Sequence, residues 1–353
     1  AGLQTADNDR FVRLWWEIKN DLDNPKWYPY SKGGPFNRWF GNFWLTVNWG
    51  SNGFEIKNFT DEKGKVRSRP QNESFYKKEG ITYSTTGSKG ASFRYLPEGY
   101  LFDMGGSSLF PSNKYSNIEY ILSLLNSKTT SYIVDCLNPT VNTQIGDLQR
   151  IPFVTPSKSF EDSISKLSKQ NIDTKKFLCS YRFIETNFTQ SPLFAFQGAA
   201  LKDRVLAYLN YENVQHTQVL INEAIINELI FEVYELSDAD REQVEAKMGL
   251  SIGSLAVVNE AKDAFLEELQ NPIAEVTEHF QNLPVTAFDE QRIREIKEAF
   301  ATLYQSNNGL EEFCIRYQVN PINVWYWFRE ANTIPQARAA EIALEFLADA
   351  IRT

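Results

Sequence analysis

The pattern of hydrophobic and polar positions divides the chain into two parts. Between about residues 40 and 110, short aromatic and β-branched runs alternate with Gly, Pro, Asn and Ser, which is typical of strands joined by exposed loops. From about residue 200 onward, apolar residues recur every three or four positions, which is the spacing of amphipathic helices. The sequence therefore predicts an α+β protein, in which a mixed α/β domain is followed by an all-α domain.

The first part is expected to begin with a helix and to continue with strands. In residues 7–22 (DNDRFVRLWWEIKNDL) the apolar side chains fall on one side of a helix. Helical spacing returns in residues 116–137. The strand-like runs between these helices are NFWLTVNW (42–49), FEIKNF (54–59), GITYST (80–85), ASFRYL (91–96) and GYLFDM (99–104).

The second part is expected to be helical almost throughout. The helical patterns cover residues 201–235, 236–249, 254–281, 287–305, 309–317, 321–331 and 335–352. The change from the mixed strand and helix pattern to continuous helical spacing lies between about residues 155 and 200. We therefore expect a mixed α/β domain over residues 1–155, a connecting helical segment over 156–200 and an all-α domain over 201–353.

The net charge of −9 is distributed unevenly between these parts. Residues 201–353 contain 12 Lys and Arg against 26 Asp and Glu, whereas residues 1–200 contain 24 against 19. Within residues 26–100, 12 basic residues accompany only 6 acidic ones. A basic section can face a polyanion such as nucleic acid, and an acidic section is poorly suited to that role.

The sequence lacks the common signatures of catalysis and metal binding. It contains no Gly-x-x-x-x-Gly-Lys-Ser/Thr phosphate loop and no Gly-x-Ser-x-Gly nucleophile elbow. The three cysteines and two histidines lie far apart, so neither a disulfide framework nor a metal site is expected. The stretch DMGGSS (103–108) is more typical of a strand-ending turn than of a phosphate-binding loop. We expect no catalytic residue and no cofactor in this chain.

The cysteine content and the hydropathy pattern also indicate where the protein works. No apolar run approaches the roughly 20 residues that span a membrane, and residues 1–11 do not have the pattern of a signal peptide. An odd number of widely spaced cysteines is typical of a reducing compartment. We therefore expect a cytoplasmic protein without a membrane partner.

Three loop-like stretches combine positive charge with glycine and hydroxyl residues. They are KWYPYSKGGPFNRWF (26–40), EKGKVRSRPQN (62–72) and STTGSKGASFR (84–94). Lys, Arg, hydroxyl groups and loop amides contact phosphates, while Arg, Lys, Asn, Gln, Ser and Thr read base edges. If these loops form one nucleic-acid surface, the candidates for backbone contact are Lys32, Arg38, Arg67, Arg69 and Lys89, and the candidates for base reading are Asn72, Ser84, Thr85, Thr86 and Ser88.

Each of these features also has a simpler interpretation. Any one of the loops is compatible with an ordinary solvated turn, and STTGSKG lies between two predicted strands as the tip of a hairpin would. The aromatic residues of this region are expected to form the local core, with stacking on bases or sugars as the alternative. These residues are Trp27, Tyr28, Trp39, Phe40, Trp44 and Trp49.

The order of several motifs along the chain resembles that in one known family. The motifs are GLQTADNDRFVRLWWEI, KWYPYSKGGPFNRWFGN, NWGSNGFEIKNF, SRPQNESFYKKEGITYSTTGS, GYLFDMGGSSLFP, ILSLLNSK and LNPTVNTQIGDLQRIPF. They resemble the region after the catalytic domain in the large adenine-specific DNA methyltransferases of BREX phage-defence systems, the PglX type. The resemblance is close over about residues 2–153. It continues weakly through NELIFEVYEL and the C-terminal NVWYWFREANTIPQARAAEIALEFL.

The resemblance implies that residues 1–155 form a target recognition domain. Such a domain selects, in double-stranded DNA, the site whose adenine is methylated at N6 with S-adenosylmethionine. The family's Asp/Asn-Pro-Pro-Tyr/Phe motif and its glycine-rich cofactor loop are absent here, and NPTV (138–141) does not replace the former. S-adenosylmethionine and catalysis are therefore assigned to an N-terminal methyltransferase domain of the parent enzyme, which would be a partner of this chain.

The resemblance also sharpens the expectations for the loops. It implies that Lys32 and Arg38 face the DNA backbone and that STTGSKG and KGKVRSRPQN govern specificity, with Thr85, Ser88 and Lys89 as the residues to replace. The family does not identify individual base-reading residues.

Three competing hypotheses remain open at this level. The acidic helical half is compatible with an interaction module that docks other phage-defence subunits. A carbohydrate-binding protein that stacks sugars on tryptophans would bind its ligand without salt dependence, unlike a DNA-binding protein. The segment LEEFCIRYQVNPINVWYWF (310–328) is compatible with a helix-turn-helix, although its second helix has no basic cluster.

Overall fold

The computed structural model describes residues 1–19, 25–87, 89–140, 142–303 and 309–352, and the chain forms two compact units. The first, called the N-terminal unit, contains residues 1–126, 130–153 and 184–188. The second, called the helical unit, contains residues 127–129, 154–183 and 189 onward. In the described residues every named strand belongs to the N-terminal unit, and the predicted α+β class is confirmed.

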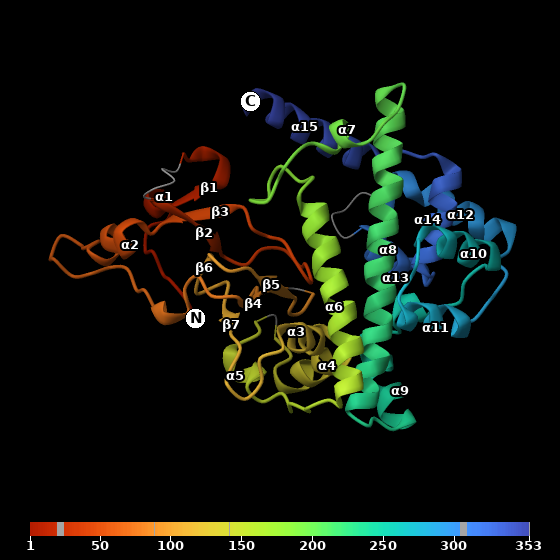
Figure 1. The fold of residues 1–353 in the computed structure, drawn as a ribbon, viewed down its shortest axis with the longest axis horizontal. Helices are drawn as coiled ribbons and strands as arrows, with labels where there is room; N and C mark the ends of the chain where they lie inside the picture. The colour runs from red at the N-terminus through yellow and green to blue at the C-terminus, as the bar shows by residue number, and fades with distance from the viewer. Residues whose placement is uncertain (20–24, 88, 141, 304–308, 353) are drawn as a thin grey trace. The chain divides into compact units, whose positions relative to one another are not determined.

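The N-terminal unit contains two small sheets (Figure 1). The first has the order β1-β3-β2-β6, with antiparallel pairs except for the parallel pair of β2 and β6. Its strands are β1 (Val12–Leu14), β2 (Trp27–Ser31), β3 (Leu45–Asn48) and β6 (Leu101–Phe102). The second sheet is antiparallel with the order β5-β4-β7, and its strands are β4 (Gly80–Tyr83), β5 (Phe93–Leu96) and β7 (Ser108–Leu109).

Aromatic side chains fill the core of this unit, which explains the high aromatic content of its short strands. Phe11, Tyr30, Trp49 and Phe102 are almost completely buried and pack with Val47. A strand of four or five residues buries little aliphatic surface, so large rings supply most of the apolar area. Of the aromatic residues expected in the core, Trp39, Phe40 and Trp49 are buried, and Trp27, Tyr28 and Trp44 are partly buried.

Three predictions for this unit are wrong. The predicted loop-like stretch 26–40 begins with the strand β2, which pairs with β3 and β6. Within residues 7–22 only α1 (Asn8–Phe11) is an α-helix, because residues 12–14 form β1 and pair with β3. A short 3-10 helix, Trp15–Glu17, follows, and residues 20–22 lie outside the described part of the chain. The stretch FEIKNF was expected to be a strand but lies mainly in α2 (Gly50–Lys57), whose first turn contains left-handed backbone at residues 51–53.

Helices that follow the strands support the second sheet. The predicted helical region 116–137 is divided into α3 (Ile118–Asn126) and α4 (Lys128–Leu137), and α5 (Ile145–Leu148) comes next. Helix α3 packs against β4 and β5. The side-chain amide of Asn126 exchanges two hydrogen bonds of 3.0 Å with the backbone of Phe93, which fixes the end of α3 to the start of β5.

The helical unit is built around one long helix, α8 (Leu201–Val233), with α6 (Lys158–Cys179) packed along it (Figure 1). Predicted region 254–281 forms two helices rather than one. The remaining helices are α7 (Pro192–Ala195), α9 (Asp238–Met248), α10 (Asn259–Glu268), α11 (Ala274–Asn282), α12 (Glu290–Leu303), α13 (Gly309–Tyr317), α14 (Pro321–Ala331) and α15 (Gln336–Arg352).

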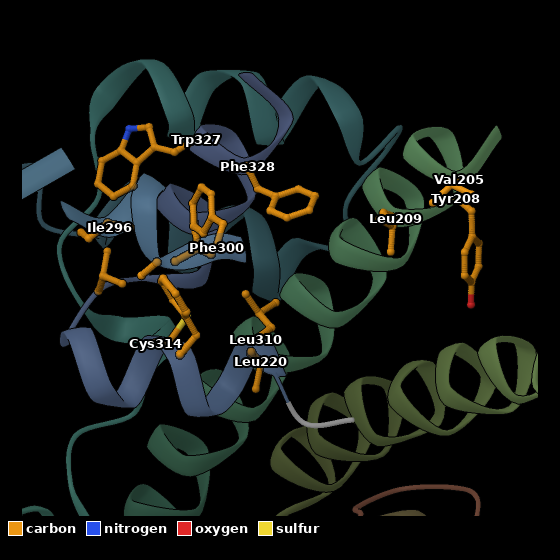
Figure 2. Close-up of a cluster of buried hydrophobic side chains, with 14 of the residues drawn as sticks. Val205, Tyr208, Leu209, Leu220, Ile296, Phe300, Leu310, Cys314, Trp327 and Phe328 are labelled. Atoms are coloured by element: carbon orange, nitrogen blue, oxygen red, sulfur yellow. The ribbon is translucent and has the colours of Figure 1, made fainter. Parts of the chain in front are cut away.

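The core of the helical unit joins α8 to the C-terminal helices (Figure 2). Leu209 and Leu220 of α8 belong to the same buried cluster as Phe300 of α12, Cys314 of α13 and Phe328 of α14. This packing explains why the apolar spacing of the sequence predicts these helices well, since each buries one face against α8 or its neighbours. Among the described residues, no helix is long and apolar enough to cross a membrane.

A largely buried ionic network connects α15 to α8. The guanidinium of Arg338 donates to Glu212 of α8 and to Glu341, and Arg182 donates to Glu341 and Glu345. Burial raises the pKa of Glu212, but the charge and hydrogen bonds of Arg338 outweigh that effect and lower it to about 2. Burial, together with the charge of Lys175, lowers the pKa of the nearby His216 to about 4.

The pKa of His216 predicts a pH dependence of stability. The unfolded chain binds a proton at His216 near pH 6.5, whereas the folded chain binds it only near pH 4, so stability should fall as the pH drops from 6.5 to 4. In His216→Gln this part of the loss should disappear. Urea unfolding at pH 7, 5.5 and 4.5 measures the effect, and equal losses in both proteins would contradict the assignment.

A second stability prediction concerns the close approach of two loops in the N-terminal unit. A β-carbon at Gly106 would lie 2.6 Å from the backbone nitrogen of Gly33 and 2.9 Å from the carbonyl oxygen of Ser31. Gly106→Ala should therefore destabilise the protein by about 1–3 kcal/mol in urea unfolding. Gly146→Ala is the matched control, because its β-carbon would meet open space in α5. Equal stability of the two variants would show that the loops do not touch.

Candidate nucleic-acid interface

Two loops meet at one edge of the first sheet. Since β2 and β6 are parallel, their carboxyl ends lie at the same edge. Residues 32–34 follow β2 and residues 103–107 follow β6, and Gly106 lets the two backbones touch. The amide of Gly105 already donates to Asp103 Oδ1 at 2.7 Å, so this turn is closed on its own side chain. That contact favours a strand-ending turn over a phosphate-binding loop.

The hairpin of β4 and β5 attaches to both loops. These strands pair antiparallel, so the connection between them is a hairpin tip, as the sequence predicts. Ser84 Oγ donates to the carbonyl oxygen of Gly34 at 2.8 Å. The backbone amide and the hydroxyl of Thr85 both donate to the carbonyl oxygen of Gly105, each at 3.2 Å. Base-reading candidates Ser84 and Thr85 are therefore fixed beside the loop that contains Lys32.

Lys32 lies in a polar network at this edge. Its Nζ donates to Asn8 Oδ1 at 2.7 Å and lies 3.8 Å from Asp103 Oδ2. Asp103 Oδ2 also accepts a 2.6 Å hydrogen bond from the buried hydroxyl of Tyr30. Burial and the charge of Asp103 raise the pKa of Tyr30 well above its usual value. The positive charge of Lys32 is thus partly balanced by Asp103, which moderates its contribution to any anion site.

The N-terminal residues extend the sheet beyond β6. They also pair with the stretch 62–72, which contains Arg67 and Arg69. The amide of Leu3 donates to Phe102, and Gln4 exchanges two backbone hydrogen bonds with Arg69. Because the pairing of Gln4 with Arg69 is antiparallel, Arg67 lies toward the edge that contains Lys32. Both arginines are exposed, and the guanidinium of Arg67 lies 5.1 Å from the ring centre of Phe59.

The structure does not bring every candidate to this edge. The same antiparallel pairing sends Asn72 toward the opposite end of the N-terminal segment, where its Nδ2 donates to the carbonyl oxygen of Ala1 at 2.8 Å. Thr86 donates to Asn142 Oδ1 at 2.7 Å, and the guanidinium of Arg38 lies 5.3 Å from the ring centre of Phe36. Lys89 is exposed, and Ser88 lies outside the described residues.

Two buried charged residues of this region, Arg94 and Glu185, were not identified from the sequence. Arg94 reads as one of several loop cations, but it lies in β5 and is fully buried. Its position in a strand between two aromatic residues was the available signal. Glu185 is also buried and contacts the loop before β3, although it follows α6 in the sequence. Nothing local marks Glu185, because its contact depends on the return of the chain to the N-terminal unit.

The arrangement combines groups that are suited to binding a polyanion. It gathers cations, hydroxyl groups and glycine backbone at one edge of a sheet, and these groups contact phosphates and base edges. Within the described residues, no group of three or more His, Cys, Asp and Glu side chains is arranged to hold a metal ion.

Comparison with known proteins relates the chain to adenine-specific methyltransferases. It is 29% identical over 251 residues to the adenine-specific methyltransferase PglX of Lacticaseibacillus casei (strain Zhang), covering 67% of this chain and 21% of that protein. It is 32% identical over 242 residues to the adenine-specific methyltransferase BrxX of Escherichia coli O9:H4 (strain HS), covering 66% of this chain and 19% of that protein. No family model matches the chain.

These similarities show homology to PglX and BrxX over about two thirds of the chain. The chain spans about one fifth of the length of these relatives. Most of each relative therefore has no counterpart here.

A salt-dependence prediction follows from the exposed arginines. If Arg67 contacts a DNA phosphate, Arg67→Ala should weaken binding to all duplex sequences similarly and reduce the slope of log K against log salt by about one. Lys202→Ala, which removes an exposed cation of the helical unit, is the matched control and should leave the slope unchanged. Fluorescence anisotropy of this chain with duplex DNA at several salt concentrations measures both. An unchanged slope for Arg67→Ala would remove it from the interface.

Proposed function

We propose that this chain provides DNA-sequence recognition for a site-specific N6-adenine DNA methyltransferase of a bacterial phage-defence system of the BREX type. The observation that carries the proposal is the homology to PglX and BrxX together with the gathering of Lys32, Ser84 and Thr85 at one edge of a sheet. In this assignment the N-terminal unit contacts double-stranded DNA. The same proposal includes a recognition domain over residues 1–155, a connecting segment over 156–200 and an all-α domain over 201–353.

The proposed contacts with DNA have two roles: some position the protein on the duplex, and others read the bases. Arg67, Arg69, Arg38, Lys32 and Lys89 supply positive charge that phosphate oxygens attract, which sets the register of the protein on the duplex. The hairpin tip is the element that enters a groove, since it has short hydroxyl side chains. The major groove is the one in which all four base pairs differ. Residues tied to the scaffold, such as Thr85, approach the bases with a fixed orientation.

Methyl transfer is assigned to the rest of the parent enzyme. This chain has neither the Asp/Asn-Pro-Pro-Tyr/Phe motif nor the glycine-rich loop of the family. S-adenosylmethionine is accordingly a cofactor of the N-terminal methyltransferase domain, which would face the same DNA site. The enzyme as a whole would work in the cytoplasm, where its DNA is.

A second function is proposed for the helical unit, which would dock other defence proteins. Its acidic surface is poorly suited to DNA. Helix α15 exposes Leu344, Leu347 and Ile351 at spacings of three and four residues, which places them on one face of the helix. Such a face is typical of helix–helix association.

Two other hypotheses receive less support from the structure. Sugar stacking requires exposed rings, whereas Trp39 and Trp49 are buried. A helix-turn-helix in residues 310–328 would need α14 to enter a groove. Trp325, Trp327 and Phe328 of that helix are buried in the helical unit, which leaves α14 little free surface.

The proposed role of the hairpin tip predicts a change of specificity. Lys89→Ala and Thr85→Ala in the full-length enzyme should alter which site is methylated, by roughly 1–3 kcal/mol of discrimination for each lost base contact. Ser88→Ala belongs to the same series, and Lys202→Ala serves as the control. Sequencing the methylated adenines of cells that express each variant measures the effect. If all three tip variants keep the parental site and efficiency, the tip is a connector and residues 63–72 become the leading candidate.

A further inference from the structure

A buried arginine lies beneath the loop that follows β2. Arg94 is 0% exposed. Its Nη1 donates to the backbone oxygens of Asn37 and Ser92, both at 3.4 Å, and its Nη2 donates to Ser84 Oγ at 3.5 Å. Within the described residues, its Nε has no hydrogen-bond partner. All three hydrogen bonds are long, so this cation is held more weakly than buried charges usually are.

Glu185 supplies a negative charge to the same region. It is 6% exposed, and its two carboxylate oxygens accept hydrogen bonds from the amides of Asn42 at 2.9 Å and Phe43 at 2.8 Å. Burial lowers the pKa of Arg94 to about 10, and the charge of Glu185 opposes this shift. Arg94 therefore stays protonated at neutral pH and has Glu185 as a counter-charge.

The two residues act on one loop, residues 34–43. In its middle, the backbone of Trp39 pairs with β5 on both sides of Arg94, through Phe93 O at 2.9 Å and Tyr95 N at 2.8 Å. Trp39 has a φ of 74°, an unfavourable backbone conformation that the surrounding contacts must maintain. Near its end, Asn42 Nδ2 donates to Pro35 O at 2.8 Å and closes the loop. The backbone of β5 on either side of Arg94 thus binds the middle of the loop, the Arg94 side chain contacts it at Asn37 O, and Glu185 binds its end.

The segment that contains Glu185 belongs to the N-terminal unit through several contacts. The amide of Thr186 donates to Phe43 O at 2.7 Å, and its hydroxyl lies 2.7 Å from the hydroxyl of Tyr100. The chain reaches this place only after it has left the unit at Phe153 and formed α6. A fragment that ends at residue 155 would therefore lack the counter-charge.

Stability alone does not account for this pair of charges. Buried ion pairs contribute little more to folding than apolar side chains of similar size, and often less. An apolar pair would fill the same space, but it would not orient Asn37 O, Ser84 Oγ or the amide of Phe43. The short hydrogen bonds of Glu185 fix the amides of Asn42 and Phe43, and the longer ones of Arg94 favour one orientation of Asn37 and Ser84.

We propose that Arg94 and Glu185 are positioning residues for DNA recognition, which hold the loop 34–43 and Ser84, the residue that follows β4, in the shape that reads the target site. The inference rests on the proposed function. It adds that specificity depends on two buried residues, one of which comes from beyond the first 155 residues. Neither residue touches the DNA.

The test uses the full-length enzyme and the double variant Arg94→Met with Glu185→Gln, which removes both charges together and so leaves neither unpaired. The expected result is a lowered urea midpoint with cooperative unfolding retained, because Gln accepts only one of the two amide hydrogen bonds. The salt slope should be unchanged, and the ratio of cognate to near-cognate methylation should fall about tenfold. The matched control is Arg338→Met with Glu212→Gln, which removes a buried ion pair of the helical unit and should leave the ratio unchanged.

The variant Arg94→Lys covers the case in which the double variant is unstable. It keeps the charge next to Glu185, but a lysine lacks the planar fork that reaches Asn37 O and Ser84 Oγ together. It should show the same loss of discrimination with little loss of stability. A folded variant of either kind that keeps the wild-type ratio would overturn the inference.

The design separates this inference from the proposed function. If the hairpin-tip variants and Arg67→Ala leave site choice and DNA affinity unchanged, the proposed function fails and the inference fails with it. If those variants act as expected while the Arg94 and Glu185 variants keep the wild-type ratio, only the positioning role is wrong.

Discussion

The parallel pairing of β2 with β6 is the interaction on which the candidate interface depends. Because parallel strands end at the same edge, it brings the loop after Ser31 against the turn after Phe102. Gly106 lets these two backbones touch, and the hairpin tip then attaches to both through Ser84 and Thr85. Without this pairing, cations and hydroxyl groups from distant parts of the sequence would not share a surface. The rest of the N-terminal unit, with its aromatic core, supports this edge.

Charge is used differently in the two units. In the N-terminal unit, Arg67 and Arg69 are exposed, whereas Arg94 is buried and has Glu185 as its counter-charge. In the helical unit, Arg338 of α15 pairs with Glu212 of α8, and Arg182 pairs with Glu341 and Glu345 of α15. The exposed arginines of the N-terminal unit can contact a polyanion. The arginines of the helical unit are bound in ion pairs within the fold. This difference agrees with a DNA-reading role for the N-terminal unit and a protein-docking role for the helical one.

The sequence was informative wherever structure follows from local pattern. The hairpin of β4 and β5 and the helices after residue 200 were predicted because alternation and helical spacing persist over whole elements. Residues 12–14 were missed because their strand exists only through pairing with β3, and FEIKNF was missed because a short apolar run fits either a strand or a helix. The separation of Asn72 from Ser84 and the contact of Glu185 with the loop before β3 both depend on long-range pairing. No local pattern reports such pairing.

The central claim is that this chain determines which DNA site its parent enzyme methylates. An exchange of regions tests it most directly: the part of BrxX that this chain matches is replaced by the chain, and the methylated adenines in cells are mapped by sequencing. If this chain selects the site, the hybrid should methylate the site of the proposed parent enzyme. A hybrid that folds, remains active and still methylates the site of BrxX would show that the chain does not select it.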